Sequence, residues 1–458
     1  MTFLLPPAPS PYFSGGNYPP QWQNNLALNF SSHERATLYR EQVQRNIETR
    51  VVNMVKQIVR GDKPFFVQNR IEASPTLVAS GSQYNPAADF TLTESFVANG
   101  GWSWRTKADK QILPRLPHGL MYVKFGTKIS QRKFALQFHL MSKIHGMVIK
   151  SMNCTIRDLY YENVSLYESQ NRLESAIYDL CHILKVPRDA LRLEATSKGL
   201  MAGNLKFQTT TGDVINLAHF KSGMLIPSVS GVDDMCEIQS DAKQIIVVEK
   251  DAVFQRLIDE RVFEEIGPTI LITGKGYPDL VTLKMIRKLR DALNLTVFAF
   301  VDCDPYGVEI ASVIRWGSFK QASIAKCAND WSIAEELTVP NLVWLGLLPS
   351  EISDFSLTHR VSSKMTMRDR HKTHLVKQRI LSNADPVWIH EIDVLQCSEY
   401  KAELEALFIH PRFANFYLQQ KLNAYYKLVQ PSCSFQAPAP TPTPVSSTNT
   451  SGSCSNNN

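Results

Sequence analysis

Acidic side chains follow two apolar segments in the central part of the chain. Glu249 comes directly after residues 244–248, and Asp302 and Asp304 come directly after residues 296–301. If both segments are strands of one parallel sheet, their carboxyl ends lie at the same edge and the three carboxylates meet there. Like charges this close do not all stay ionised unless a cation neutralises them. Oxygen ligands without nearby Cys or His favour Mg²⁺ or Mn²⁺ over zinc, so the spacing predicts such a metal site.

A glycine-containing loop, Gly274-Lys275-Gly276, follows a third apolar segment at residues 269–273. Backbone N–H groups and a lysine at this edge suit a phosphate. Together with the metal, they indicate phosphoryl-transfer chemistry on a phosphodiester or a nucleotide. The alternative is structural, because Asp302 and Asp304 precede a helical pattern, where an N-cap residue is favourable.

The elements around these residues alternate between strand and helix. Apolar segments at 244–248, 269–273 and 296–301 are separated by helical patterns, and the connections are short; the helical patterns are 252–258, 279–291 and 308–314. This alternation predicts a parallel sheet covered on both faces. A further apolar run at 343–348 and helical patterns at 403–407 and 416–422 indicate that one α/β domain with an extension occupies residues 240–430.

Helical patterns also precede this domain. They cover residues 134–150, a stretch that begins near Thr155, and residues 173–184. Two strand-like segments, 191–195 and 200–207, then flank a turn and predict a hairpin. Three short helices followed by a hairpin describe a winged-helix domain, which we place at residues 128–210. A small helical subdomain with an incidental hairpin is the alternative that this pattern leaves open.

The flanking regions differ from these two domains. Residues 1–30 have no periodicity and predict a disordered, mobile arm, whereas residues 31–61 predict a helix that starts with a Ser31–Glu34 capping box. The apolar stripe of this helix fits packing on its own domain or binding to a partner. Residues 62–127 predict an irregular region, and residues 431–458, which contain no charged residue, predict a disordered tail.

A basic run lies within the extension. Its charged residues are Lys364, Arg368, Arg370, Lys372, Lys377 and Arg379. Such a run is typical of a solvated helix face, and a surface for the DNA backbone is the alternative.

The composition is that of an ordinary globular protein. The chain has 458 residues, of which 44% are hydrophobic, and this excludes wholesale disorder and suggests two or three domains. The formal net charge of +6 permits a nucleic-acid partner without demanding one. The eight cysteines form no CxxC pair, which indicates free thiols in a reducing compartment. We expect neither a secretory signal nor a membrane span.

The combination of Glu249, the glycine loop and the stretch from Asp302 to Gly307 resembles the Toprim domain of topoisomerases, primases and related nucleases. Upstream, the stretch from Thr155 to Tyr161 is similar to the active-site motif of the Spo-eleven family, which comprises meiotic proteins and their relative, the topoisomerase VI A subunit. Further matching stretches are 193–203, 248–254, 273–280 and 315–318. The similarity covers about residues 130–425, whereas residues 62–127 and both tails fall outside it.

This resemblance implies a fold and a mechanism. A winged helix carries the nucleophilic tyrosine and is followed by a Toprim domain. The nucleophile is the second tyrosine of the pair, Tyr161, although adjacent aromatic residues on a helix usually pack. Arg157, four residues earlier, lies on the same helix face and can stabilise the phenolate and the phosphate charge. The expected product is a 5′-phosphotyrosyl link.

The resemblance also implies contacts and partners. Lys198, Lys275 and Tyr277 match positions that we expect to contact DNA. The partners implied are double-stranded DNA, a second copy of the chain, a topoisomerase VI B-like subunit bound through the N-terminal helix, and meiotic accessory proteins on chromosomes in the nucleus. In the dimer, the tyrosine of one protomer works with the metal-binding acids of the other. One position departs from the family, because Leu283 stands where an arginine is usual and Lys284 follows it.

Four functions are compatible with these residues. We expect the chain to form meiotic DNA double-strand breaks by topoisomerase-like transesterification and so to initiate homologous recombination. The alternatives are a topoisomerase VI A subunit that reseals its breaks, a Toprim nuclease that uses water, and a catalytically silent DNA-binding scaffold. Tyr161 discriminates among them, because a hydrolase would tolerate its replacement by phenylalanine. No P-loop is present in the chain, so strand passage would need a separate ATPase subunit.

Overall fold

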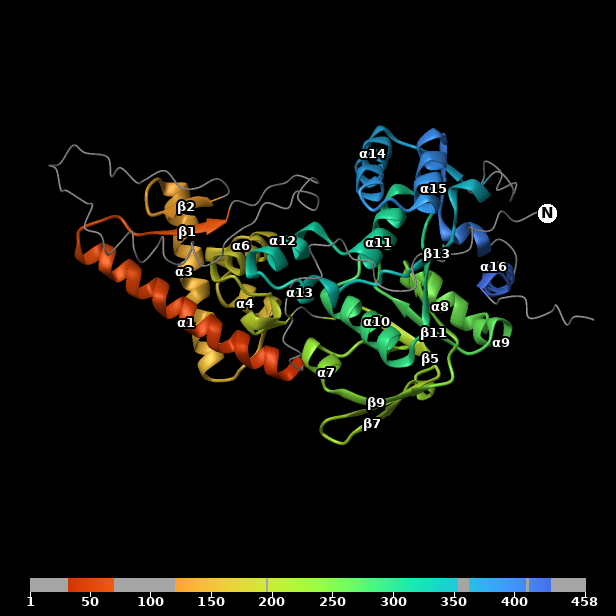
Figure 1. The fold of residues 1–458 in the computed structure, drawn as a ribbon, viewed down its shortest axis with the longest axis horizontal. Coiled ribbons are helices and arrows are strands. Elements are labelled where there is room, and N and C mark those ends of the chain that lie inside the picture. The colour runs from red at the N-terminus through yellow and green to blue at the C-terminus, as the bar shows by residue number, and fades with distance from the viewer. Residues whose placement is uncertain (1–31, 70–119, 195–196, 353–361, 409–411, 430–458) are drawn as a thin grey trace, which may run out of the picture.

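The computed structural model describes residues 32–69, 120–194, 197–352, 362–408 and 412–429. The predicted arm, most of the predicted irregular region and the predicted tail lie outside these residues. The described chain forms an N-terminal, mainly helical body and a larger α/β body (Figure 1). Across the described segments, no helix is both long enough and apolar enough to cross a membrane.

The N-terminal body is built from packed helices around its own hydrophobic cluster. Its helices are α1 (Ser32–Val59), α3 (Lys128–Ile149), α4 (Ile156–Glu162), α5 (Val164–Tyr167) and α6 (Gln170–Leu184). Two antiparallel strands, β1 (Phe65–Asn69) and β2 (Leu120–Lys124), belong to the same body. The predicted helices therefore form, with α3 beginning earlier than its apolar pattern.

The long helix α1 is confirmed, and it has two apolar surfaces. Val43, Ile47 and Met54 are buried in the cluster of the N-terminal body. Asn46 donates a hydrogen bond to the carbonyl of Leu184 at 2.7 Å, which ties α1 to the end of α6. Val55 is 53% exposed, so the helix packs on its own domain and also keeps apolar side chains at the surface.

The predicted parallel sheet is confirmed. Its order is β13 (Val343–Gly346), β12 (Thr296–Phe300), β10 (Gln244–Val248), β11 (Thr269–Thr273), β5 (Leu200–Gly203) and β8 (Met224–Leu225), and the first four run parallel. The strands β10 and β11 are buried along their whole length, as expected for a sheet covered on both faces. The helices after the strands are α8 (Asp251–Asp259), α10 (Leu280–Leu293) and α11 (Pro305–Trp316).

The predicted wing hairpin is wrong. The segment β4 (Leu193–Glu194) pairs in parallel with β3 (Cys154–Thr155), whereas β5 pairs antiparallel with β11 of the large sheet. Gly203 allows this close approach, because a side chain there would meet the backbone of Thr269. Strand β6 (Leu205–Thr209) joins β7 (Val214–Asn216) and β9 (Met235–Ser240) in a separate three-stranded sheet. Residues 200–209 are therefore part of the α/β body.

The extension is attached to the large sheet beside its carboxyl edge. The strands β14 (Ser362–Lys364) and β15 (Tyr400–Ala402) pair antiparallel, and Ala402 also bridges to Cys303. Its helices are α14 (Met367–Leu381), α15 (Pro386–Cys397) and α16 (Phe413–Val429); the helix predicted at 403–407 is a 3₁₀ turn, Leu404–Phe408. Shorter helices α7 (Val229–Asp233), α9 (Val262–Ile266) and α13 (Ser332–Glu335) complete the α/β body, whereas α12 (Phe319–Ala328) packs Ile324 into the hydrophobic cluster of the N-terminal body.

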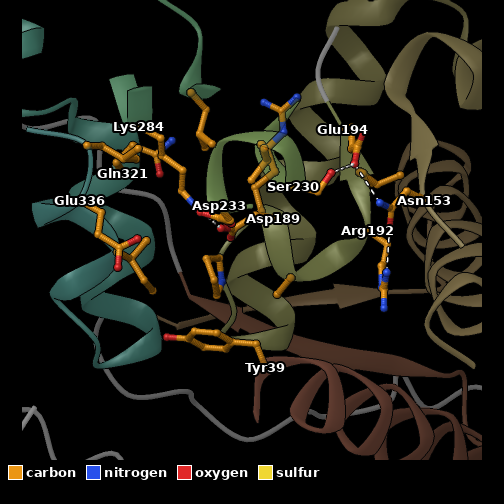
Figure 2. A pocket seen from close by; sticks show the side chains of 18 of the residues that line it. Tyr39, Asn153, Asp189, Arg192, Glu194, Ser230, Asp233, Lys284, Gln321 and Glu336 are labelled. Atoms are coloured by element: carbon orange, nitrogen blue, oxygen red, sulfur yellow. Dashed lines mark hydrogen bonds and ion pairs between the residues drawn. The ribbon is translucent and has the colours of Figure 1, made fainter. Parts of the chain in front are cut away.

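A polar cavity of about 190 Å³ lies where the two bodies meet (Figure 2). The ammonium of Lys284 is 2.9 Å from the carboxylate of Asp189, and this ion pair joins α10 to the N-terminal body. Leu283 is buried in the core of the α/β body. Lys284, the basic residue that follows Leu283, is therefore already engaged in an ion pair between the two bodies.

Candidate active site

Two of the predicted metal-binding acids lie side by side at the carboxyl edge of the sheet. Glu249 follows β10, Asp302 follows β12, and these strands are parallel neighbours. The backbone N–H of Asp302 donates to Oε2 of Glu249 at 2.9 Å. Glu249 is only 9% exposed and Asp302 only 5%. The parallel register therefore brings both carboxylates together in a buried place.

Asp304, the third acid, caps helix α11. Its Oδ1 accepts hydrogen bonds from the backbone N–H groups of Tyr306 at 2.9 Å and Gly307 at 2.8 Å. The N-cap alternative therefore holds for Asp304. Its Oδ2 has no hydrogen bond within the described residues, so one oxygen of this carboxylate stays available to a ligand.

The electrostatics of the two buried acids differ from those of surface carboxylates. Burial raises the pKa of Glu249 to about 8, and the negative charges of Asp302 and Asp304 add to this shift. Burial likewise raises the pKa of Asp302 to about 6. Two acids that resist ionisation at one edge form a place where a cation would be stabilised.

Lys250 was not predicted to belong to the site, yet its ammonium group supplies a positive charge beside Asp302. Its Nζ is 2.9 Å from Oδ2 of Asp302, 3.0 Å from Glu403 and 2.7 Å from Glu405. Burial alone would lower the pKa of Lys250, but hydrogen bonds to these carboxylates raise it above its ordinary value. The sequence offers one indication of this role, because Lys250 directly follows the predicted metal ligand Glu249.

The donor chemistry of this edge fits Mg²⁺ or Mn²⁺, because Glu249, Asp302 and Asp304 offer only oxygen ligands. Within the part of the chain that the structure describes, no three acidic, His or Cys side chains are already arranged around one point as metal ligands. The ammonium of Lys250 instead contacts Asp302.

The glycine loop is only partly as predicted. The N–H of Lys275 donates to Oγ1 of Thr273 at 3.1 Å, and the N–H of Gly276 donates to the carbonyl of Glu249 at 2.8 Å. These two N–H groups are therefore used inside the protein, and the prediction that they bind a phosphate is wrong. The loop instead fixes the backbone of Glu249.

The predicted DNA-contacting side chains surround this loop. Nζ of Lys198 donates to the carbonyl of Lys275 at 3.4 Å, and Nζ of Lys275 is 2.9 Å from the carboxylate of Asp251. The hydroxyl of Tyr277 donates to Glu309, and burial together with this contact raises the pKa of Tyr277. Tyr277 is still 43% exposed, so its ring lies at the surface beside the acids.

Tyr161 lies on the short helix α4. The hydroxyl of Thr155 caps this helix by accepting from the N–H of Asp158 at 3.0 Å, and Leu159 is buried beneath it. Tyr160 packs against the hydrophobic cluster, whereas Tyr161 is 63% exposed. The packing alternative therefore holds for the first tyrosine of the pair and not for the second.

Arg157 lies one helical turn before Tyr161 and is also exposed. Neither its guanidinium nor the Tyr161 hydroxyl has a hydrogen-bond partner among the residues that the structure describes. Both groups are therefore available to an external anion. They belong to the N-terminal body, whereas Glu249 and Asp302 lie in the α/β body (Figure 1).

Gly307 provides a test of how tightly the acids are packed. A Cβ atom at this position would lie 3.0 Å from Oε2 of Glu249 and closer still to the carbonyl of Asp302. We expect Gly307→Ala to lower the free energy of unfolding by about 2–4 kcal/mol, measured by urea denaturation.

Gly146, in the last turn of α3, is the matched control for this substitution. A Cβ atom there meets nothing within 4 Å, so Gly146→Ala should raise the free energy of unfolding by roughly 0.5–1 kcal/mol. Equal effects of the two substitutions would show that the backbone at Gly307 can relax away from the acids.

Comparison with known protein families gives two matches in chain order. Residues 132–193 match the family described as "Type IIB DNA topoisomerase". Residues 244–422 match the family described as the Toprim domain of Spo11 and of the topoisomerase 6 A subunit. The first match covers α4, which carries Tyr161, and the second covers all three acids.

Individual relatives agree with these matches. The mouse meiotic recombination protein SPO11 is 35% identical over 295 residues, which are 64% of this chain and 72% of the mouse protein. The human meiotic recombination protein SPO11 is 34% identical and is covered over 74% of its length. The A subunit of DNA topoisomerase 6 from Arabidopsis thaliana is 30% identical over 402 residues, 87% of this chain and 84% of that protein.

Proposed function

Because the chain belongs to the family of Spo11 and the topoisomerase VI A subunit, which are DNA-cleaving type IIB topoisomerases, we propose that it forms meiotic DNA double-strand breaks that start homologous recombination. The observation that carries the proposal is that Tyr161 on α4 is exposed and its hydroxyl has no hydrogen-bond partner among the described residues, while acids are buried at the edge of the Toprim sheet. The identities to the mouse and human meiotic proteins support the meiotic role.

The reaction that we propose is a transesterification. The Tyr161 oxygen attacks the phosphorus of a phosphodiester, and the bond from phosphorus to the 3′ oxygen breaks. The phenol loses its proton to solvent, and the departing 3′ oxygen takes up a proton and becomes a hydroxyl. A phenol is a weak nucleophile unless the charge that develops on its oxygen is stabilised, and we assign the stabilisation of the phenolate and of the phosphate charge to Arg157.

In the α/β body, Glu249, Asp302 and Asp304 would hold Mg²⁺ or Mn²⁺. The bound ion would neutralise the charge that develops on the phosphate. Lys198, Lys275 and Tyr277 lie around the same edge and position the DNA. These residues and Tyr161 lie in different bodies of one chain. We therefore propose that the tyrosine of one protomer acts with the acids of a second protomer on double-stranded DNA.

A B-type partner is the proposed occupant of the exposed side of α1. Three apolar side chains of α1 lie outside its buried face. Val52 is 50% exposed, Val55 is 53% exposed and Ile58 is 57% exposed. The double substitution Val52→Glu, Val55→Glu should lower co-purification with the topoisomerase VI B-like subunit of the same organism by about tenfold or more. The melting temperature should change little, because both side chains already face solvent.

Arg45→Ala is the control, since Arg45 is also on α1, is exposed and, within the described residues, forms its ion pair with Glu41 on the same helix. Retained binding by the glutamate variant would place the partner elsewhere on the chain.

Meiotic accessory proteins and a location on chromosomes in the nucleus are parts of the same proposal.

Resealing of the breaks is the second candidate function. The topoisomerase 6 protein of Arabidopsis aligns with a larger share of this chain than the mouse and human meiotic proteins do. A topoisomerase VI A subunit would relax supercoiled DNA when combined with ATP and its B-type partner. A meiotic transesterase would leave the protein on the DNA ends.

The test is a covalent-adduct assay in meiotic cells. The protein is immunoprecipitated under denaturing conditions, and the 3′ ends of attached DNA are labelled with terminal transferase. Labelled oligonucleotides that remain linked through their 5′ ends are the expected result. Breaks that form without any such adduct would contradict the covalent mechanism and favour a nuclease or a silent scaffold.

A further inference from the structure

An exposed group of basic residues lies at the start of α14. We name Lys364, Arg368 and Arg370 the basic rim. All three are exposed, and none has an ion-pair partner within the described residues. The acidic residue among them, Asp369, is buried and is 3.1 Å from Nζ of Lys401. The basic rim therefore carries positive charge that Asp369, the acidic residue within it, does not neutralise.

Backbone pairing places this rim beside the candidate active site. Cys303, which stands between Asp302 and Asp304, exchanges hydrogen bonds with Ala402 at 2.9 and 3.1 Å. Ala402 pairs in turn with Ser362 of β14, the strand that ends at Lys364. The rim is therefore joined to the acids through one intervening strand.

A side-chain network gives the same placement independently. Glu309 on α11 accepts from the hydroxyl of Tyr277 and lies 2.5 Å from Nζ of Lys372 on α14. Arg368 is four residues before Lys372, so these two residues lie on the same side of α14. Arg368 is thus next to the surface that carries Tyr277.

The helix that carries the rim is firmly held. A capping box joins Thr366 and Asp369 at its start. Near its end, the buried Arg379 donates to the carbonyl of Gly317, and its guanidinium stacks over the ring of Phe319. The backbone that carries Arg368 and Arg370 therefore stands at a fixed position, so binding does not have to order the helix.

We propose that the basic rim binds the phosphate backbone of the DNA duplex on one side of the cleaved bond. This inference rests on the proposed function. Charge complementarity carries it, because a rim of one sign next to a phosphodiester-cleaving site fits a polyanion that extends beyond the scissile phosphate. The contacts are to phosphates, so they position the duplex and do not read its sequence.

The salt dependence of DNA binding tests the rim. The full-length chain and its Arg368→Gln, Arg370→Gln variant are titrated against a fluorescent duplex of random sequence at several NaCl concentrations. Each lost phosphate contact lowers the slope of log K against log salt by about 0.9. Arg368 shares its side of α14 with Lys372 and should account for about 0.9 of slope, whereas Arg370, two residues on, lies on another side of the helix and adds at most the same amount. The Arg368→Lys, Arg370→Lys variant keeps the charges and should keep the slope.

A matched control removes two other exposed charges. Lys206 on β6 and Lys221 are exposed, and the β7–β9 sheet to which β6 belongs lies at the opposite end of the α/β body from α14 (Figure 1). Lys206→Gln, Lys221→Gln should leave the slope unchanged. Circular dichroism checks that α14 still folds in each variant.

The outcomes separate the two proposals. A wild-type slope in the Arg368→Gln, Arg370→Gln variant overturns the rim proposal and makes this face a solvated surface, while the proposed function stands. An equal loss of slope in the control variant also overturns it, because the effect then follows net charge and not position. A wild-type chain that binds no duplex at any salt concentration overturns the proposed function, and the rim proposal with it.

Discussion

Tyr161→Phe is expected to abolish the protein–DNA adduct, lowering its yield by about 10³-fold or more. The substitution removes only the hydroxyl oxygen, which is the atom that would form the bond to phosphorus. The ring is 63% exposed and its hydroxyl has no hydrogen bond within the described ranges, so the free energy of unfolding should change by less than about 0.5 kcal/mol. A variant that folds normally and leaves no adduct separates chemistry from structure.

Tyr160→Phe is the control for this experiment. Tyr160 is the neighbouring ring, 5.4 Å from that of Tyr161 between centroids, but it packs against the core of the N-terminal body. Its variant should keep the adduct. An adduct that persists in Tyr161→Phe and vanishes in Tyr160→Phe would exchange their roles, and breaks that form equally in both variants without an adduct would point to hydrolysis by water.

The parallel sheet could be predicted from the sequence because its signal is local. Residues 245–248 and 270–272 are apolar without interruption, and the segments that contain them are flanked by helical patterns. The same topology rule then brought Glu249 and Asp302 together, since residues that follow parallel neighbouring strands share one edge. For this part of the site, order along the chain determined position in space.

The true partners of the two strands in the predicted wing hairpin could not be predicted in the same way, because strand pairing joins residues that lie far apart in the sequence. Residues 191–195 and 200–207 look like two arms of a hairpin, yet the strands β4 and β5 within them pair elsewhere, with β3 and β11. An antiparallel place between β11 and β8 in the large sheet buries Met201 and Ala202. A two-stranded hairpin would leave much of that apolar surface in water.

The prediction that the N–H groups of Lys275 and Gly276 bind a phosphate was wrong for a related reason. The pattern of glycines around Lys275 shows that the backbone turns sharply, but it does not show which carbonyl each N–H group meets. Lys250 was missed because its partners, Glu403 and Glu405, lie far along the chain. Both glutamates reach the ammonium group of Lys250 because they follow strand β15, whose Ala402 pairs with Cys303. No local sequence pattern predicts that pairing.

Glu249→Gln is expected to make the metal-free protein more stable while it removes DNA cleavage. Glutamine keeps an oxygen that can accept the hydrogen bond from the N–H of Asp302 but carries no charge. Because the carboxylate is buried beside Asp302 and Asp304, its ionisation opposes folding at neutral pH. The variant should gain roughly 1–3 kcal/mol in free energy of unfolding at pH 8 in EDTA. Adduct formation should fall by about 100-fold or more, since a ligand carboxylate is lost.

The pH dependence of this gain follows from the direction of the pKa shifts. Burial raises the pKa of Glu249 to about 8 from its ordinary value of 4.5, so the folded chain binds more protons than the unfolded chain between these pH values. The free energy of unfolding of the wild type should therefore fall as pH rises through this window, and Asp302, with a pKa raised to about 6, contributes to the same fall at lower pH. The advantage of the glutamine variant should thus be small at pH 5 and largest at pH 8, measured by urea denaturation. A variant that is less stable than the wild type at pH 8 would mean that Lys250 already compensates the charge of Glu249, and that this edge of the sheet needs its carboxylates even without a metal ion.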